Sequence, residues 1–163
     1  MATVVMVDVE ELVVNALLGM SELAALEGRI YSIAPKARTF PMARVSRFGG
    51  DPMWEGVPYW IDQPAMQVDV WADGGYVEAY SIAEQMRACL ATKLVGAWPE
   101  GVVVHSKVSA LIATGDTEFD PIKPRYRFTV TLITHPLTSG ITDPTVAGSP
   151  DGGRLTHAGS PGS

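Results

Sequence analysis

Residues 65–72 have the sequence Ala-Met-Gln-Val-Asp-Val-Trp-Ala and are followed by the turn residues Asp73-Gly74-Gly75. Apolar side chains at positions 66, 68 and 70 alternate with Gln67, Asp69 and Trp71, which is the period of a strand with one apolar face. From Tyr76 the apolar spacing becomes helical, at Ala79, Ile82, Ala83, Met86, Leu90 and Leu94. We therefore expect a strand, a tight turn with Asp73 as helix N-cap, and an amphipathic helix over 76–94 that packs on the strand.

The chain before this unit contains one clear helix and one irregular segment. A stripe of apolar residues predicts a helix from about Asp8 to Leu18, with a capping box between Asp8 and Glu11. A short helical turn is expected at 21–26 and a strand at 29–33. Residues 36–64 are rich in Gly and Pro and predict a long loop, with a candidate strand at 42–48. This loop carries Trp54, Tyr59 and Trp60.

The chain after the central helix predicts two more strands. A turn at 98–101 leads to a long candidate strand over 102–114, and a connection leads to the strand 125–135. In the last strand, Tyr126, Phe128, Val130 and Leu132 share one face while Arg125, Arg127, Thr129 and Thr131 share the other. Such alternation is typical of an antiparallel sheet with one face packed on the core.

These elements predict an α+β fold: a mainly antiparallel sheet of about four strands with two amphipathic helices on one face. The chain of 163 residues is long enough for one such domain, which we expect over 1–135. From Pro136 the composition shifts to Gly, Ser, Thr, Pro and Asp, so residues 136–163 are expected to form a flexible C-terminal tail.

Composition excludes several classes of protein. A net charge of −6 argues against a general basic surface for nucleic acid. The single cysteine, Cys89, cannot form an internal disulfide and is expected to be a small buried hydrophobe. No apolar run is long enough for a membrane span, and no signal peptide is evident, so we expect no membrane partner and a cytosolic site of synthesis.

No catalytic or metal-binding constellation is evident, so we expect neither an enzyme nor a cofactor. The three histidines, His105, His135 and His157, lack metal-ligand spacing. The Gly-Gly pairs lack the Lys and Ser/Thr of a phosphate-binding loop. Asp116, Glu118 and Asp120 are more simply a solvated acidic loop than an acid–base pair.

A basic stretch stands out in this acidic chain. Between Gly28 and Gly50 there are five cations and no acidic residue: Arg29, Lys36, Arg38, Arg44 and Arg47. One hypothesis is head-to-tail pairing between subunits, in which these cations meet Asp116 and Glu118 of the next copy and the contacts close into a ring. The alternative is pairing within one subunit or an ordinary solvated surface.

The order of elements and several local features resemble the tail terminator, or tail completion, proteins of bacteriophages with long, non-contractile tails. The resemblance covers about residues 8–136. It is carried by the Arg29-Ile30-Tyr31 strand, Pro58-Tyr59-Trp60, the Val-Asp-Val-Trp-Ala strand before the helix, Gly101-Val102-Val103, and the Pro124-Arg125-Tyr126-Arg127 strand that ends at His135-Pro136.

The resemblance implies a structural virion protein without catalytic residues. It implies a ring, commonly of six subunits, that caps the tail tube, stops its polymerisation and offers a joining surface to the head-side connector. DNA would pass through the lumen without specific binding. The subunit would assemble in the host cytoplasm and reside at the head-proximal end of the tail. Its predicted interface residues are Arg29, Arg44, Arg47, Trp54, Tyr59, Trp60, Asp116, Glu118, Arg125 and Arg127.

Three other functions stay open at this stage. The chain is alternatively another head–tail connector component or the tail-tube subunit itself, which would polymerise into long tubes. From a different class, it is a small enzyme with residues 36–64 as a lid, or a binding module that uses Trp54, Tyr59 and Trp60 for recognition.

Overall fold

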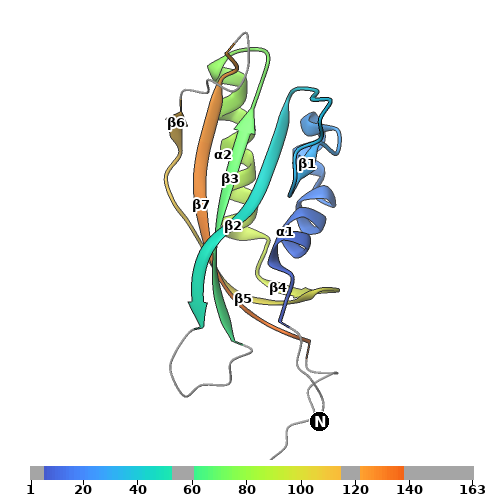
Figure 1. Ribbon diagram of the computed structural model, residues 1–163, viewed down its shortest axis with the longest axis vertical. Coiled ribbons are helices and arrows are strands. Elements are labelled where there is room, and N and C mark those ends of the chain that lie inside the picture. The colour runs from blue at the N-terminus through green and yellow to red at the C-terminus, as the bar shows by residue number, and fades with distance from the viewer. Residues whose placement is uncertain (1–5, 53–60, 115–121, 138–163) are drawn as a thin grey trace, which may run out of the picture.

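A computed structural model describes residues 6–52, 61–114 and 122–137 of the chain (Figure 1). The α+β class is confirmed. The elements follow in the order α1 (Val9–Leu18), η1 (Ser21–Leu26), β1 (Ile30–Tyr31), β2 (Met42–Pro52), β3 (Asp62–Trp71), α2 (Tyr76–Thr92), β4 (Gly96–Trp98), β5 (Gly101–Val108), β6 (Ile112–Thr114) and β7 (Arg125–His135).

One curled sheet contains all the strands, in the order β1-β2-β3-β7-β5-β4, with β6 also paired to β7. Every pairing is antiparallel except that of β1 with β2. The prediction of about four strands was therefore too low, because the sheet has seven. β4, with three residues, lies outside every predicted strand and is too short for a period of two residues to show in a sequence. β6 is the end of the predicted strand 102–114, and the strand expected at 29–33 is present as β1, with two residues.

Both long helices pack on one face of the sheet, as predicted (Figure 1). The register places Val45 beside Val68 and Val68 beside Phe128, so the apolar residues of β2, β3 and β7 form one surface. This surface packs against a single core cluster that includes Leu12 and Leu17 of α1 and the buried residues of α2. Burial of this apolar area is the main force that holds the two layers together.

The helix α1 begins as the sequence predicts, whereas α2 does not. The Asp8 carboxylate accepts a hydrogen bond from the Glu11 amide at 3.1 Å, which satisfies an otherwise unpaired donor of the first turn. The N-cap of α2 is Gly75 rather than Asp73. Asp73 instead forms an ion pair with Lys123, and Glu78 reaches back to accept from the Gly74 amide at 2.6 Å.

Within the segment 36–64, the candidate strand 42–48 is present and the strands extend well beyond it. β2 continues to Pro52 and β3 begins at Asp62, so the two strands form a long antiparallel pair. A register shift between Arg47 and Gly49 inserts an extra residue, and Gly50 follows with φ of 109°. A Cβ at Gly50 would overlap the backbone of Gln63, so the close approach of the strands requires glycine there. Glycine here marks a bulge rather than a loop.

The predicted strand 102–114 is two strands, β5 and β6, both paired to the same edge of β7. Between them the chain leaves the ladder, and Ser109 anchors it. Its hydroxyl accepts from the Thr129 amide and its own amide donates to the Thr129 carbonyl, both at 2.9 Å. The boundaries of β7 match the prediction. The proposed tail, residues 136–163, lies almost wholly outside the described residues, which end at Leu137.

Truncation of the central core residue should be costly. Phe128 is fully buried between the sheet and the helices. We expect Phe128→Ala to lower the free energy of unfolding by about 3–5 kcal/mol, through lost transfer energy and the cavity left behind. Urea denaturation followed by circular dichroism measures this loss. The matched control is Val77→Ala on the outer surface of α2, where the side chain is 85% exposed and the change should stay within about 0.5 kcal/mol. Equal effects of the two substitutions would contradict this account of the core.

Candidate functional site

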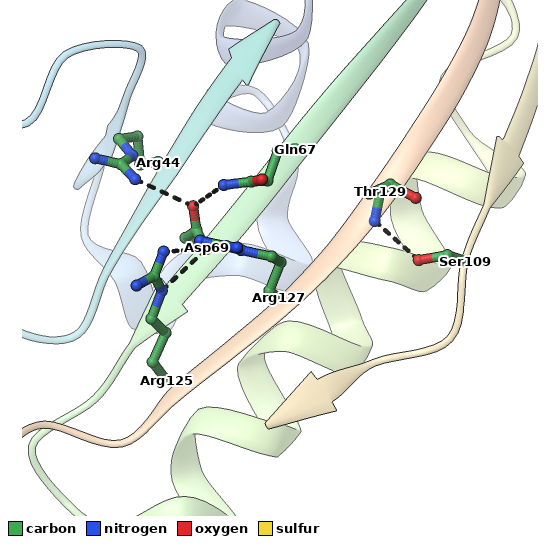
Figure 2. A network of polar contacts seen from close by, with 7 residues as sticks. All are labelled: Arg44, Gln67, Asp69, Ser109, Arg125, Arg127 and Thr129. Atoms are coloured by element: carbon green, nitrogen blue, oxygen red, sulfur yellow. Dashed lines mark hydrogen bonds and ion pairs between the residues drawn. The ribbon is translucent and has the colours of Figure 1, made fainter. Parts of the chain in front are cut away.

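The face of the sheet opposite the helices carries a charged cluster. The register places Arg44 of β2 directly beside Asp69 of β3, and Asp69 directly beside Arg127 of β7. Trp71, two residues along β3, is paired with Arg125 of β7. Successive residues of a strand alternate between faces, so these side chains all project from the open face. Figure 2 shows Arg44, Gln67, Arg125 and Arg127 converging on the Asp69 carboxylate. We call Arg44, Gln67, Asp69, Arg125 and Arg127 the Asp69 cluster.

The Asp69 carboxylate is fully buried and accepts hydrogen bonds from four side chains. Oδ1 accepts from Arg125 Nε and Nη2 at 3.0 and 2.8 Å and from Arg127 Nε at 2.8 Å. Oδ2 accepts from Gln67 Nε2 at 2.9 Å and from Arg44 Nη2 at 3.3 Å. A carboxylate offers about four lone-pair sites, so these five bonds saturate it.

The guanidinium groups decide the charge state of Asp69. Burial alone would raise the pKa of its carboxyl group, because desolvation disfavours the charged form. Hydrogen bonds from Arg127, Gln67 and Arg125 and the charge of Arg125 outweigh burial, so the pKa lies below its ordinary value. Asp69 is thus ionised at neutral pH. Three guanidinium groups pair with this one carboxylate, and the two more exposed of them, on Arg44 and Arg127, share it.

Trp71 gives the cluster an aromatic support. Its side chain is also buried on the open face, where the Arg44 and Arg125 guanidiniums lie 5.4 and 4.9 Å from the ring centroid. Cation–π attraction of this kind holds an arginine over a ring and restricts its rotamers. The open face is therefore not simply polar, because two of its central residues, Asp69 and Trp71, are covered by arginine side chains.

The predicted interface arginines fall into separate places. Arg44, Arg125 and Arg127 come together around Asp69. Arg47 forms a bidentate ion pair with Asp62, at 2.8 and 3.2 Å, and its backbone amide donates to the carboxylate of Glu10 in α1. Arg29 donates to the Pro41 carbonyl and to Glu27. Arg29, Arg44 and Arg47 thus have partners within one chain, and their role between subunits stays a prediction. Five further predicted interface residues lie outside the described residues: Trp54, Tyr59, Trp60, Asp116 and Glu118.

Asp69 is the residue that sequence reasoning missed. Asp69 alternates with the apolar residues of its strand, which indicated a position on the solvated face. The same alternation in the strand 125–135 placed Arg127 on a polar face. The available signal was that one aspartate and three arginines, Arg44, Arg125 and Arg127, all occupy the polar positions of alternating strands. That signal becomes a site only when the register of β2, β3 and β7 is known.

The described residues offer no obvious catalytic centre. Among them, no group of three or more His, Cys, Asp and Glu side chains is arranged to hold a metal ion. A shallow depression of about 360 Å³ lies on the outer face of α2, beside Val77 and Tyr80, and its one carboxylate, Glu84, is paired with Arg87. Burial raises the pKa of the Cys89 thiol, which disfavours the reactive thiolate. No helix in the described part of the chain is long and apolar enough to cross a bilayer.

Neutralising Asp69 should destabilise the subunit. In Asp69→Asn the three arginines lose their shared counter-charge. We expect unfolding free energy to fall by about 2–4 kcal/mol near pH 7, toward the lower part of the range for breaking a buried pair, because two of the guanidiniums reach water. Asp73→Asn is the control. It removes an exposed ion pair and should cost under about 1 kcal/mol.

The effect of Asp69→Asn should depend on pH in a defined direction. The folded-state pKa of Asp69 is lowered, so its stabilisation is complete above the unfolded pKa of about 3.9 and is lost as the pH falls through the folded pKa. Urea titrations at pH 7 and at several values below 4 should show wild type and Asp69→Asn converging. A gap of constant size across that range would exclude the ion pairs as its cause.

Comparisons with known proteins agree with this fold. The chain matches the family described as "Tail completion protein gp17" over residues 11–110. A search of curated proteins gave no match. Among solved structures, a chain described as "Virion of native gene transfer agent (GTA) particle" is similar, with a TM-score of 0.54 and 18% identity over 76% of this chain and 91% of that one. At this identity the likeness concerns the fold. The family match covers more than half of the sequence, and the resemblance found in the sequence is confirmed: the chain belongs to the tail completion protein gp17 family and is a structural protein of the bacteriophage tail.

Proposed function

We propose that this protein forms a ring, of six subunits by family resemblance, that caps the tail tube, stops its polymerisation and joins it to the head-side connector. The observation that supports this most directly is the family match over residues 11–110. The ring would assemble in the host cytoplasm and reside at the head-proximal end of the tail. The partners would be other copies of this chain, the tail-tube protein and the connector.

The two layers of the subunit have unlike charge, which suits a heterologous ring. The helices α1, η1 and α2 contain five acidic residues and one basic residue: Glu10, Glu11, Glu22, Glu78, Glu84 and Arg87. On the open face of the sheet, two partly exposed arginines, Arg44 and Arg127, share the single carboxylate of Asp69. A surface that differs from the one it meets produces head-to-tail contacts, which close into rings when the rotation permits.

A ring built in this way has two different ends, and this explains how growth would stop. One end would copy the surface that a tube subunit offers to its neighbour and so bind the last tube ring. The other end would present a different surface, to which no further tube subunit binds. The net charge of −6 would help DNA to pass, because adhesion through phosphate neutralisation needs clustered Lys and Arg around the lumen.

The two alternatives differ in what they require. A tail-tube subunit or another connector protein would share the fold, and the first would polymerise into long tubes instead of single rings. An enzyme with residues 36–64 as a lid is disfavoured by the fold. Much of that segment forms the strands β2 and β3, which are fixed in the sheet on either side of residues 53–60.

Removal of the protein tests the proposal. A phage that carries a nonsense codon in this gene should produce DNA-filled heads without tails, together with tail tubes of abnormal length. Electron microscopy of the lysate measures both. Purified protein added to the extract should restore joining, and heat-denatured protein is the control. Virions that lack the protein yet carry normal tails would refute the proposed role.

A further inference from the structure

We infer that the Asp69 cluster is a docking site for carboxylate groups of a second copy of this chain. The inference rests on the proposed ring and names one of its contacts. Arg44 and Arg127 are the two residues that would receive the incoming carboxylate. Asp69 would act as the internal anion that holds both guanidiniums in place.

Arg44 and Arg127 keep donors after they have bound Asp69. Each guanidinium has five N–H groups, and Asp69 takes only Nη2 of Arg44 and Nε of Arg127. The two side chains are 30% and 34% exposed. Arg44 Nε is buried and has no hydrogen-bond partner, so the local donor supply exceeds the acceptors. A planar guanidinium group with free N–H groups can bind a carboxylate through two parallel hydrogen bonds, in bidentate geometry.

The cluster is preorganised, which lowers the cost of docking. The Arg44 guanidinium is held from one side by Asp69 and from another by the Trp71 ring at 5.4 Å. Ordering a long side chain at an interface costs about 0.5–1.5 kcal/mol, and here the fold has already restricted it. An incoming carboxylate would therefore meet donors of Arg44 and Arg127 that are already fixed in place.

The same chain offers carboxylates that match this site. Within the described residues, Glu11 of α1 and Asp51 of β2 are exposed, and their carboxylates accept no hydrogen bond and form no ion pair. Asp51 is paired with Gln63, six residues along β3 from Asp69, which is about 20 Å. Glu11 belongs to the helix layer on the opposite face of the sheet. These carboxylates reach a cluster only on another copy.

A second copy is a better match than DNA. The chain as a whole has 18 acidic and 12 basic residues, so a neighbour presents mostly carboxylates. The cluster is small and contains a buried anion, whereas binding of a phosphate backbone depends on many Lys and Arg side chains that together displace the counterions condensed on the DNA. DNA remains a distinct outcome in the test below.

The first experiment measures subunit association in Arg127→Glu by native mass spectrometry over a range of concentrations. The apparent dissociation constant should rise at least about tenfold, since reversing one partner of an interfacial charge pair adds repulsion to the lost contact. Lys107→Glu is the control. Lys107 is an exposed cation of β5, it lies opposite Thr131 and outside the Asp69 cluster, so the dissociation constant should change much less. If Arg127→Glu proves unfolded by circular dichroism, Arg127→Gln replaces it, with the same criterion.

The second experiment identifies the docked group. Rings assembled from equal amounts of ¹⁵N-labelled and unlabelled Arg127→Lys are treated with a carbodiimide, which joins an amine to a carboxylate in direct contact. Mass spectrometry should find cross-links from position 127 to an acidic peptide of the differently labelled chain. Cross-links confined to Asp69 of the same chain would overturn the inference.

The outcomes separate this inference from the proposed function. Absence of any wild-type ring, with or without the tube protein, would reject the ring and this contact together. Equal association of wild type and Arg127→Glu would reject the contact alone and leave the ring intact. Intact Arg127→Glu rings that bind fluorescent duplex DNA more weakly than wild-type rings would also overturn it and assign the cluster to phosphate.

Discussion

Pairing of β3 along both edges, with β2 and with β7, is the constraint on which the other features of this fold depend. Because both neighbours are long, the register of β3 fixes both faces of the sheet at once. Met66, Val68 and Val70 then form the surface that the helices cover. A shift of one residue would move them to the open face and carry Asp69 into the helix core, which is why such a sheet tolerates only one register. The apolar core and the Asp69 cluster therefore both follow from the register of β3.

Long elements with a regular apolar pattern could be predicted from the sequence. α1, α2 and β7 were placed within two residues at each end, because ten or more residues repeat one pattern in each. The short strand β4 was not predicted, because its pairing with β5, rather than an alternation of its own side chains, makes it a strand. The end of β2 beyond the candidate strand 42–48 and the start of β3 are predicted as loop, since Gly50 and Pro64 usually break strands. In the structure Gly50 follows a bulge and Pro64 lies in a buried strand position opposite it.

The Asp69 cluster could not be predicted because it depends on distance in the fold rather than in the chain. Arg44 is 25 residues from Asp69, and Arg125 and Arg127 are 56 and 58 residues away. The sequence marked Arg44, Arg125 and Arg127 as interface candidates from their charge alone. It gave no reason to group them, and it suggested solvent around Asp69. Burial of a carboxylate is tolerated only with paired charges and hydrogen bonds, so its environment follows from the partners that the register supplies.

The cluster also connects subunit stability with assembly. A buried carboxylate balanced by one arginine would be neutral and would attract nothing. Here one carboxylate orders three arginines, so the structure stabilises itself and keeps positive charge at its surface. The contrast with the Arg47–Asp62 pair is informative, because that pair is one to one and leaves no excess. Arg47 therefore stabilises the end of the β2–β3 pair, whereas Arg44 and Arg127 retain charge for a partner. Identical residue types in one basic stretch thus have different roles, decided by the number of anions that each one meets.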